Sequence, residues 1–413
     1  MPAVIDDDLY ADEVIADPYA YYGWLREVDP VHWNARYETW VVTRYADIVW
    51  LLRRPELFSS RFYADDQQPP SPPIAAGDMD ELRFVSRFRS SEFIQNDPPE
   101  HSRMRNVVNR FFTPGRMELW RGMVREVVDT LLTDVESRDR FDVLPDLAAQ
   151  LPLRVIAELL GVPADDRQSL KEHADRRMRS ALSLAPDRMR VAASGIRDTS
   201  DYLEAALDGG RTGAAGSLLE ILHGAETTGS SSRAETLANA QLLIDAGHET
   251  TVQLICNGML ALLTHREQWD RLVADPAGLA AGATEECLRY DPPLPAPRRL
   301  VAQDVELGGS FLRRGQRVVF VLAAGNRDPR VFPDPDRFDI TRSPNRHVVF
   351  GSGMHVCLGQ YLARMEGQEV FRALATRMPD LELTDKPVQY AKVRGVRSLL
   401  GLPVRRQQPA GSR

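Results

Sequence analysis

FGSGMHVCLG, residues 350 to 359, is the stretch on which the interpretation of this 413-residue chain depends. Its glycines permit a tight backbone turn, and Cys357 stands directly before a helix predicted from Leu358 to Met378. A helix N-terminus lowers the pKa of a cysteine through its dipole and its free N–H groups, so the position favours a thiolate. On residue type alone a buried, inert cysteine is more common. The glycines and His355 beside Cys357 favour a functional one.

The composition is that of a soluble globular protein, with 43% hydrophobic and 27% charged residues. A net charge of −8 gives no reason to expect nucleic acid or an anionic membrane surface as partner. No apolar run approaches the roughly 18 residues of a membrane span, and the acidic start lacks the basic and then apolar order of a secretory signal. We therefore expect a cytoplasmic protein. Three cysteines, Cys256, Cys287 and Cys357, are too few for a disulfide framework.

The spacing of apolar residues predicts one mainly α-helical domain over residues 1–413, with a smaller β portion. The helical body is expected over residues 100–290 and 358–378, and the β-rich part near 31–43 and 300–322. Strands are predicted at Val31 to Asn34, Thr39 to Thr43, Leu300 to Leu307 and Arg317 to Leu322, and shorter helices at Pro18 to Val28, Ala46 to Arg53 and Ala280 to Tyr290.

Prolines between Gln67 and Ile74 predict a long loop from about Phe58 to Pro99, because proline removes a backbone donor and restricts its predecessor. Long loops inside compact proteins are often functional. With Phe84, Phe88 and Phe93 as apolar contacts, this loop is predicted to be a mobile lid. The alternative is a solvated surface excursion.

Between Arg233 and Leu263 no proline interrupts an apolar, helical pattern, which predicts one helix of about 30 residues and about 45 Å. Its middle reads AGHETT, from Ala246 to Thr251. Glycine costs about 1 kcal/mol relative to alanine in a helix, and a threonine hydroxyl can bond to the carbonyl one turn earlier. We therefore expect a local distortion there.

The FGSGMHVCLG stretch resembles the haem-binding loop of the cytochromes P-450, Phe-Gly-x-Gly-x-His-x-Cys-x-Gly, at all six fixed positions. The resemblance extends over roughly Pro18 to Val404. It implies the cytochrome P-450 fold, with haem b between the long central helix and the helix after the cysteine. Cys357 would be the axial thiolate, an arrangement that favours O–O cleavage. The haem would be surrounded by Ala246, Gly247, Phe350, Gly351, His355 and Gly359.

The resemblance also assigns roles outside the cysteine loop. Glu249 and Thr250 match an acid–alcohol pair that relays protons to dioxygen, which an apolar pocket needs. The propionates would be bound by His101, Arg105, Arg299 and His355, since arginine can bind both oxygens of a carboxylate. Glu286 and Arg289 match a buried Glu-x-x-Arg pair with a structural role. The substrate pocket would include Phe84, Phe88, Phe93, Leu242, Leu243, Leu294, Pro295 and Ala296.

The implied activity is that of a monooxygenase that hydroxylates or epoxidises a lipophilic small molecule with O2. The chain offers no room for a flavin or nicotinamide domain, so electrons are expected from a separate ferredoxin and its NADH- or NADPH-dependent reductase. An acidic ferredoxin would dock near Arg105, Arg110, Arg116 and the helix after Cys357. One alternative is a thiolate-haem protein that only binds a ligand, or a haem enzyme that uses peroxide or rearranges its substrate. A further alternative is a zinc site on His355 and Cys357.

Overall fold

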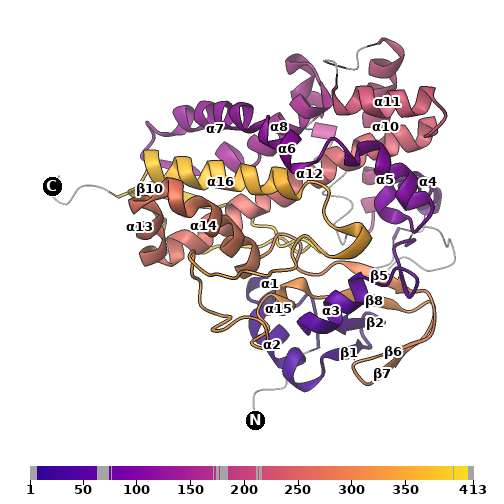
Figure 1. Cartoon of the computed structure of the whole chain (residues 1–413), viewed down its shortest axis with the longest axis horizontal. Helices are drawn as coiled ribbons and strands as arrows, with labels where there is room; N and C mark the ends of the chain where they lie inside the picture. The colour runs from indigo at the N-terminus through magenta and orange to yellow at the C-terminus, as the bar shows by residue number, and fades with distance from the viewer. Residues whose placement is uncertain are drawn as a thin grey trace.

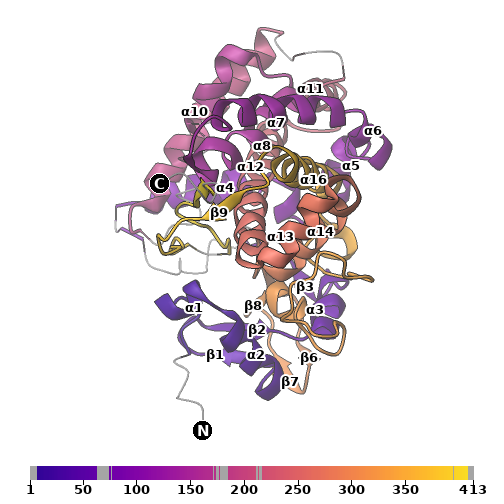
Figure 2. The same cartoon turned by 90° about the vertical axis from the view of Figure 1, so that its left-hand side faces the viewer.

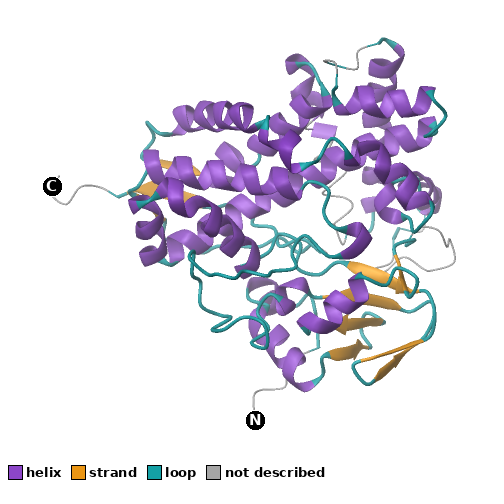
Figure 3. Ribbon diagram, in the orientation of Figure 1, coloured by secondary structure: helices purple, strands orange, loops and turns teal. Residues whose placement is uncertain are grey.

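The structure is a computed structural model that describes residues 7–62, 74–75, 77–170, 172–173, 176, 185–210, 213, 216–393 and 395–407. Most of the described chain is helical, and strands form a smaller part gathered mainly at one end (Figures 1 and 3). The predicted fold class, mainly α with a smaller β portion, is confirmed. No helix of the described residues is long and apolar enough to span a membrane.

The longest helix is α12 (Arg233–Thr264), which has 32 residues and confirms the predicted central helix. It begins at a capping box in which Ser232 accepts from the Glu235 backbone N–H and the Glu235 carboxylate accepts from Ser232. Such a cap pairs two backbone donors that the helix start would leave free. The helix runs through the interior of the helical part (Figure 1) and packs against α8 (Leu151–Leu160), α14 (Pro276–Tyr290) and α16 (Gln360–Arg377).

Other helices surround this central helix and bury one stripe each. In α7 (Arg121–Val135) the buried residues Val124, Val128, Leu131 and Val135 recur three or four positions apart, and this stripe faces α8 and α16. The remaining helices of this part are α4 (Met79–Arg89), α5 (Glu100–Asn109), α6 (Pro114–Glu118), α10 (Arg188–Asp208), α11 (Leu218–Thr227) and α13 (Arg266–Ala274).

A five-stranded sheet lies at the opposite end of the molecule from α7 and α10 (Figures 1 and 2). Its order is β1–β2–β8–β5–β3, and β2 runs parallel to β8 whereas the other neighbours are antiparallel. The strands are β1 (Val31–Asn34), β2 (Thr39–Val42), β3 (Phe58–Ser59), β5 (Arg298–Val301) and β8 (Arg317–Phe320). The short helices α1 (Asp12–Ala16), α2 (Tyr19–Val28), α3 (Tyr45–Leu52) and α15 (Leu322–Gly325) accompany the sheet.

Two smaller sheets complete the β portion. Strands β4 (Arg140–Asp142), β10 (Pro403–Arg406) and β9 (Leu381–Leu383) form one sheet, and β6 (Val305–Leu307) and β7 (Ser310–Leu312) form a hairpin. The prediction of a single strand from Leu300 to Leu307 was wrong, because the chain ends β5 at Val301 and turns into β6. These sheets join segments far apart in the sequence, and strands of three or four residues give little periodic signal.

The predicted loop from Phe58 to Pro99 was also wrong in part. It contains the eleven-residue helix α4 and a short 3₁₀ turn at Phe93–Gln95. The proline run at 69–73 lies outside the described residues, and α4 itself contains no proline. The restriction that proline imposes on its neighbours therefore does not reach Met79.

Candidate active site

The cysteine loop is a turn that its glycines make possible. The backbone N–H of Cys357 donates to the carbonyl of Phe350 at 2.8 Å, which closes the loop. Gly351 and Gly353 have φ values of 73° and 76°, a region that other residues rarely adopt. A Cβ on Gly353 would also lie 2.8 Å from the Leu52 carbonyl oxygen. The glycine spacing is therefore required by the backbone.

The helix after the loop begins at Gln360, two residues later than predicted, and Cys357 precedes it. Although Cys357 keeps exposed surface, the protein atoms around its sulfur raise the thiol pKa. The Gly359 N–H and the charge of Arg105 lower it less. The expected depression of the pKa was thus wrong for the polypeptide by itself, because desolvation outweighs the helix end. A coordinated metal ion would ionise such a thiol.

The other two cysteines differ sharply from Cys357. Cys256 and Cys287 are buried, and burial raises both thiol pKa values well above the ordinary range. Within the described part of the chain no three His, Cys, Asp or Glu side chains gather as a metal site. His355 and Cys357 therefore lack the further ligands of a four-coordinate zinc site there.

Four cationic or potentially cationic side chains converge beside the cysteine loop. His101 and Arg105 lie one turn apart on α5, and Arg299 lies on β5. The His101 and His355 rings are in contact, tilted by 54° with centroids 4.2 Å apart. Arg105 donates to the carbonyls of Met354 at 2.9 Å and Val356 at 2.6 Å. The structure thus brings together the residues predicted to bind propionates. Because Arg105 is buried against the loop, its predicted place on an exposed docking surface is corrected.

The electrostatics of this cluster show what it can bind. Burial, together with Arg105, lowers the pKa of His101 to about 4, and burial together with Arg299 lowers that of His355 to about 2. Burial also lowers the pKa of Arg299 to about 10. Three buried ring nitrogens have no hydrogen-bond partner among the described residues: Nδ1 and Nε2 of His101, and Nδ1 of His355. Buried, unpaired ring nitrogens, one of which carries the N–H of each neutral imidazole, lie beside two arginines and fit an anionic group such as the propionates of haem.

Sequence reasoning missed two residues of this region. Ser60 shares a 2.9 Å hydrogen bond with His355 Nε2, and its backbone N–H donates to Asp97 Oδ1 at 2.9 Å. These contacts fix β3 and the following residues against the cysteine loop. Sequence separations of 37 and 295 residues leave no local pattern that could have predicted them.

The residues in the middle of α12 are solvent-accessible, although the residues on either side of them are buried. Ala246 is exposed and Gly247, Glu249 and Thr250 are half-buried, whereas residues 236–245 and 251–259 are buried. Glu249 and Thr250 lie three and four positions after Ala246, so each shares a helix face with Ala246. Thr250 Oγ1 donates to the Ala246 carbonyl at 2.8 Å, which is the predicted bond. The helix continues to Thr264 without a break, so the expected distortion does not interrupt it.

The polar residues around this face have separate partners. Glu249 Oε1 accepts from Gln253 Nε2 at 3.1 Å and from Ser398 Oγ at 3.3 Å. His248 shares a 3.1 Å bond with the Ala149 carbonyl, so it is a packed residue. Thr251 donates to Glu366 at 3.4 Å in α16, and burial raises the pKa of Glu366 to about 8. Ser398, Gln253 and Glu366 were not predicted, because their contacts depend on tertiary packing.

Glu286 and Arg289 are both fully buried in α14 and form a bidentate pair at 2.8 Å. Arg289 also donates to the carbonyls of Asn326, Pro335 and Arg337 at 2.7 to 3.0 Å. Glu286 accepts from the backbone of Asp339, and from Asn345 and Arg342. The pair therefore connects α14 to the irregular segment that precedes the cysteine loop.

The predicted pocket residues occupy several environments. Phe84 and Phe88 pack between α4 and α10, in a cluster with Val85 and Ile196. Phe93 is buried and lies edge-on to His101. Leu242 and Leu243 are buried in α12, and Leu294 lies beside Gly395. Pro295 and Ala296 line a cavity at the surface. The structure thus distributes these eight residues, with Phe84 and Phe88 serving helix packing.

Comparison with known proteins assigns the chain to a family. The family described as "Cytochrome P450" matches residues 279–378. The biotin biosynthesis cytochrome P450 of Bacillus subtilis is 34% identical over 398 residues, which cover 95% of this chain and 97% of that protein. The cytochrome P450 monooxygenase PikC of Streptomyces venezuelae is 37% identical over an alignment that covers 100% of this chain and 97% of PikC. The chain belongs to the cytochrome P450 family.

Solved structures agree with this assignment. A crystal structure of P450BioI in complex with an acyl carrier protein ligated to hexadec-9Z-enoic acid superposes with a TM-score of 0.87 at 32% identity. The match covers 96% of this chain and 99% of that one. This P450 is therefore an oxidoreductase of the monooxygenase type, and its family carries a haem whose iron is bound by a cysteine thiolate.

Proposed function

We propose that this P450 inserts one oxygen atom from O2 into a lipophilic small molecule, by hydroxylation or epoxidation, with haem b bound at Cys357. The observation that carries the proposal is the convergence of His101, Arg105, Arg299 and His355 beside the only cysteine with exposed surface in the described chain. Two buried cysteines leave no competing thiolate.

The protein's part in holding the haem follows from these contacts. Cys357 would supply the axial thiolate, and the cationic cluster would bind the propionates with charge-assisted hydrogen bonds. Phe350, Gly351 and Gly359 would keep the loop backbone close to the ring, and Ala246 with Gly247 would leave room on the opposite side. When bound, haem with a thiolate ligand supplies the oxygen-activating chemistry.

The half-buried Glu249 and Thr250 are proposed to move protons to the dioxygen site. Glu249 is a half-buried carboxylate in the middle of α12, and Thr250 donates its hydroxyl to the Ala246 carbonyl one turn earlier. A proton donor inside a pocket that excludes water gives general acid catalysis worth about 10²–10⁴ in rate. This pair favours the monooxygenase over the alternatives of ligand binding, peroxide use or rearrangement.

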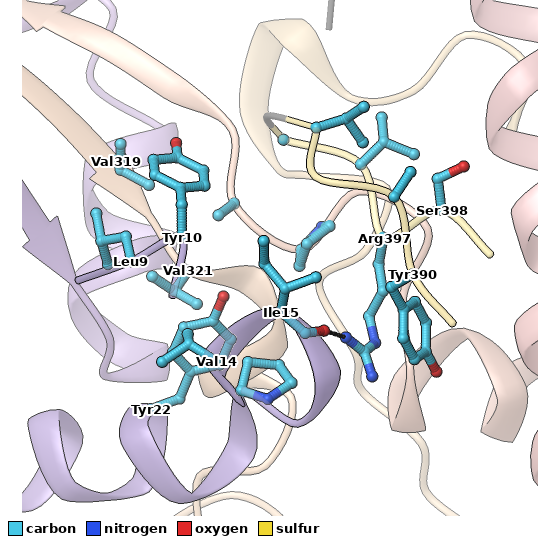
Figure 4. Close-up of a pocket in the computed structure, with 17 residues that line it drawn as sticks. Leu9, Tyr10, Val14, Ile15, Tyr22, Val319, Val321, Tyr390, Arg397 and Ser398 are labelled. Carbon is cyan, nitrogen blue, oxygen red and sulfur yellow. Dashed lines mark hydrogen bonds between the residues drawn. The ribbon is translucent and has the colours of Figure 1, made fainter. Parts of the chain in front are cut away.

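The substrate class is supported by the apolar residues near the candidate pocket and by the relatives. One relative is named for biotin biosynthesis, and P450BioI was crystallised with a fatty acyl carrier protein. We propose a lipophilic substrate, free or attached to a carrier, that reaches the pocket past Leu294, Pro295 and Ala296. Pro295 and Ala296 line a surface cavity together with apolar residues such as Val319 and Val321 (Figure 4), which supports this route.

Electrons are proposed to come from a ferredoxin and an NADH- or NADPH-dependent reductase. Arg110 is exposed at the end of α5, Arg116 is exposed in α6, and Leu119, three residues after Arg116, is 82% exposed. An acidic partner would meet exposed guanidinium groups and an exposed apolar residue, a composition typical of interface centres and rims.

The test uses the haem-loaded enzyme with a ferredoxin, its reductase and ¹⁸O2. Lipophilic compounds are first screened for the shift in the haem spectrum that displacement of the iron's water ligand causes. With a compound that binds, we expect a product that carries one ¹⁸O atom and forms only with reductant. Product that forms equally without reductant, or without ¹⁸O, would contradict the proposal and favour the rearranging enzyme.

A further inference from the structure

A network of three polar side chains lies behind the cysteine loop, where α14 and α16 run side by side (Figures 1 and 2). Glu285 belongs to α14 and Arg364 to α16. Arg364 donates to both oxygens of the Glu285 carboxylate, at 2.7 Å and 3.2 Å. The almost fully buried side chain of His347 shares a 3.0 Å hydrogen bond with Glu285 Oε2 through its Nε2. Glu285 is therefore fixed from two sides, and it fixes Arg364.

Arg364 is the member of this network that reaches the cysteine loop. Its guanidinium carbon lies 4.3 Å from the centre of the Phe350 ring. Phe350 is the first residue of the loop, and its carbonyl accepts the Cys357 backbone N–H at 2.8 Å. Gln360 Oε1, in the first turn of α16, accepts from Arg364 at 3.0 Å. A fixed positive charge therefore lies against the residue that closes the loop around Cys357.

Solvent screens the charges of this network only in part. The side chains of Arg364 and Glu285 are 26% and 27% exposed. Partly buried charges are screened much less than exposed ones. Burial raises the pKa of the Cys357 thiol, and the charge of Arg364 is among the influences that lower it. Although the pair has no net charge, its positive member faces Phe350 and acts on the sulfur.

We propose that Arg364 and Glu285 together set the reduction potential of the haem bound at Cys357. Reduction transfers one electron from the proposed ferredoxin to the iron, and so adds one negative charge there. The guanidinium of Arg364 stabilises this added charge, and the carboxylate of Glu285 opposes it. Neither residue is catalytic, since both act at a distance. Protein groups around a metal and its ligand are known means of tuning it. This inference rests on the proposed binding of haem at Cys357.

The first experiment measures the reduction potential of the haem-loaded protein by spectroelectrochemistry, without ferredoxin, in Arg364→Gln and Glu285→Gln. Arg364→Gln should lower the equilibrium constant for reduction roughly 3- to 10-fold, and Glu285→Gln should raise it by a similar factor. These factors correspond to about 28–59 mV, because a tenfold change is 59 mV for one electron. A pair with a structural role alone would give shifts of the same sign or none, and either result would overturn the inference.

Arg377 and Glu136 provide a matched control pair. Arg377 ends α16, Glu136 follows the last residue of α7, and their side chains are 24% and 39% exposed. Arg377 lies about 20 Å along the helix axis from Arg364. Arg377→Gln should change the equilibrium constant by less than about 1.5-fold, because exposed charges beyond about 10 Å are largely screened at 0.1 M salt. A shift as large as that of Arg364→Gln would reflect net charge alone and would contradict the inference.

Two further variants separate charge from geometry. Arg364→Lys keeps the charge but cannot make the bidentate contact, so its potential should lie close to that of the natural protein. A potential like that of Arg364→Gln would show that the contact matters and the charge does not, and the inference would be wrong. In the double variant Arg364→Gln with Glu285→Gln the opposite shifts should largely cancel. If Arg364→Gln loses haem, Arg364→Lys and Glu285→Gln still decide between the two outcomes.

The red-shifted band of the reduced carbon monoxide complex separates this inference from the function on which it rests. The band should be present in the natural protein and in every variant, because the thiolate ligand is unchanged. If the natural protein lacks the band, the proposed haem site and this inference both fail. If the band is present and the potentials of Arg364→Gln and Glu285→Gln do not move in opposite directions, this inference alone fails.

Discussion

The hydroxyl of Thr250 donates to the carbonyl oxygen of Ala246 at 2.8 Å, on the half-buried face in the middle of a 32-residue helix. Both residues keep accessible surface where their neighbours along the helix are buried. The bond orients the hydroxyl without consuming its two acceptor positions. A proton donor can therefore approach Thr250 from the pocket side.

Thr250→Ala removes this hydroxyl and should separate reductant use from product formation. We expect reductant consumption to continue, with product per electron pair lower by roughly tenfold or more and hydrogen peroxide higher by the matching amount. Thr250→Ser, which keeps the hydroxyl, is the control. An unchanged product yield in Thr250→Ala would leave Glu249, acting through water, as the sole relay group.

Cys357→His should abolish the red-shifted band of the reduced carbon monoxide complex, because that band requires a thiolate ligand. Cys256→Ala and Cys287→Ala should keep it, since both thiols are buried and inert. The assignment fails if the Cys357→His protein retains the band while either control loses it.

Glu286→Gln should destabilise the fold strongly. It leaves the fully buried Arg289 without its bidentate partner, and breaking a buried pair costs about 3–5 kcal/mol. The exposed pair Arg330 and Glu27 serves as control, and Glu27→Gln should cost less than about 1 kcal/mol. Urea unfolding of the haem-loaded proteins measures both. Equal losses in the two variants would argue against a structural role for Glu286.

Glu366 predicts a pH dependence of stability. Its folded-state pKa of about 8 lies above the ordinary value of 4.5. The buried acid therefore binds a proton that the unfolded chain has lost, so its stabilisation is complete below pH 4.5 and disappears as the pH rises through 8. The free energy of unfolding should fall by up to about 1.4 kcal/mol per pH unit in this window.

Glu366→Gln removes this contribution while keeping the shape of the side chain. The difference in unfolding free energy between the variant and the natural protein, measured in urea from pH 5 to pH 8, should shift in favour of the variant. Two parallel pH profiles would mean that Glu366 does not titrate in this range.

Arg110→Glu should slow turnover with an acidic ferredoxin at low salt. Exposed charge pairs are screened over about 10 Å at 0.1 M salt and about 3 Å at 1 M, so turnover of the natural protein should also slow as salt rises. Arg314→Glu, an exposed change near β7 at the opposite end of the molecule, is the control. Rates that do not depend on salt or on Arg110 would exclude electrostatic docking.

How far the sequence could be read depended on how local the determining interactions are. The 233–264 helix, the glycine turn at Gly351 and Gly353 and the Thr250 bond follow from neighbouring residues, and all are present. The contacts of Ser60, Glu366 and Ser398 join segments 115 to 295 residues apart, and no local residue pattern predicts such contacts. Helix α4 was missed because the proline restriction was extended beyond the prolines.

The order of the five-stranded sheet has a consequence for synthesis of the chain. Strand β2 ends at Val42, but its neighbour β8 begins at Arg317, roughly 275 residues later. At about 5–20 residues per second, a ribosome needs about 14–55 s to supply that neighbour. During this time the edge of β2 stays unpaired on the nascent chain, and unpaired edges invite aggregation. We expect the yield of folded protein from a heterologous host to improve at lower growth temperature, or with added chaperones that cover such edges until translation ends.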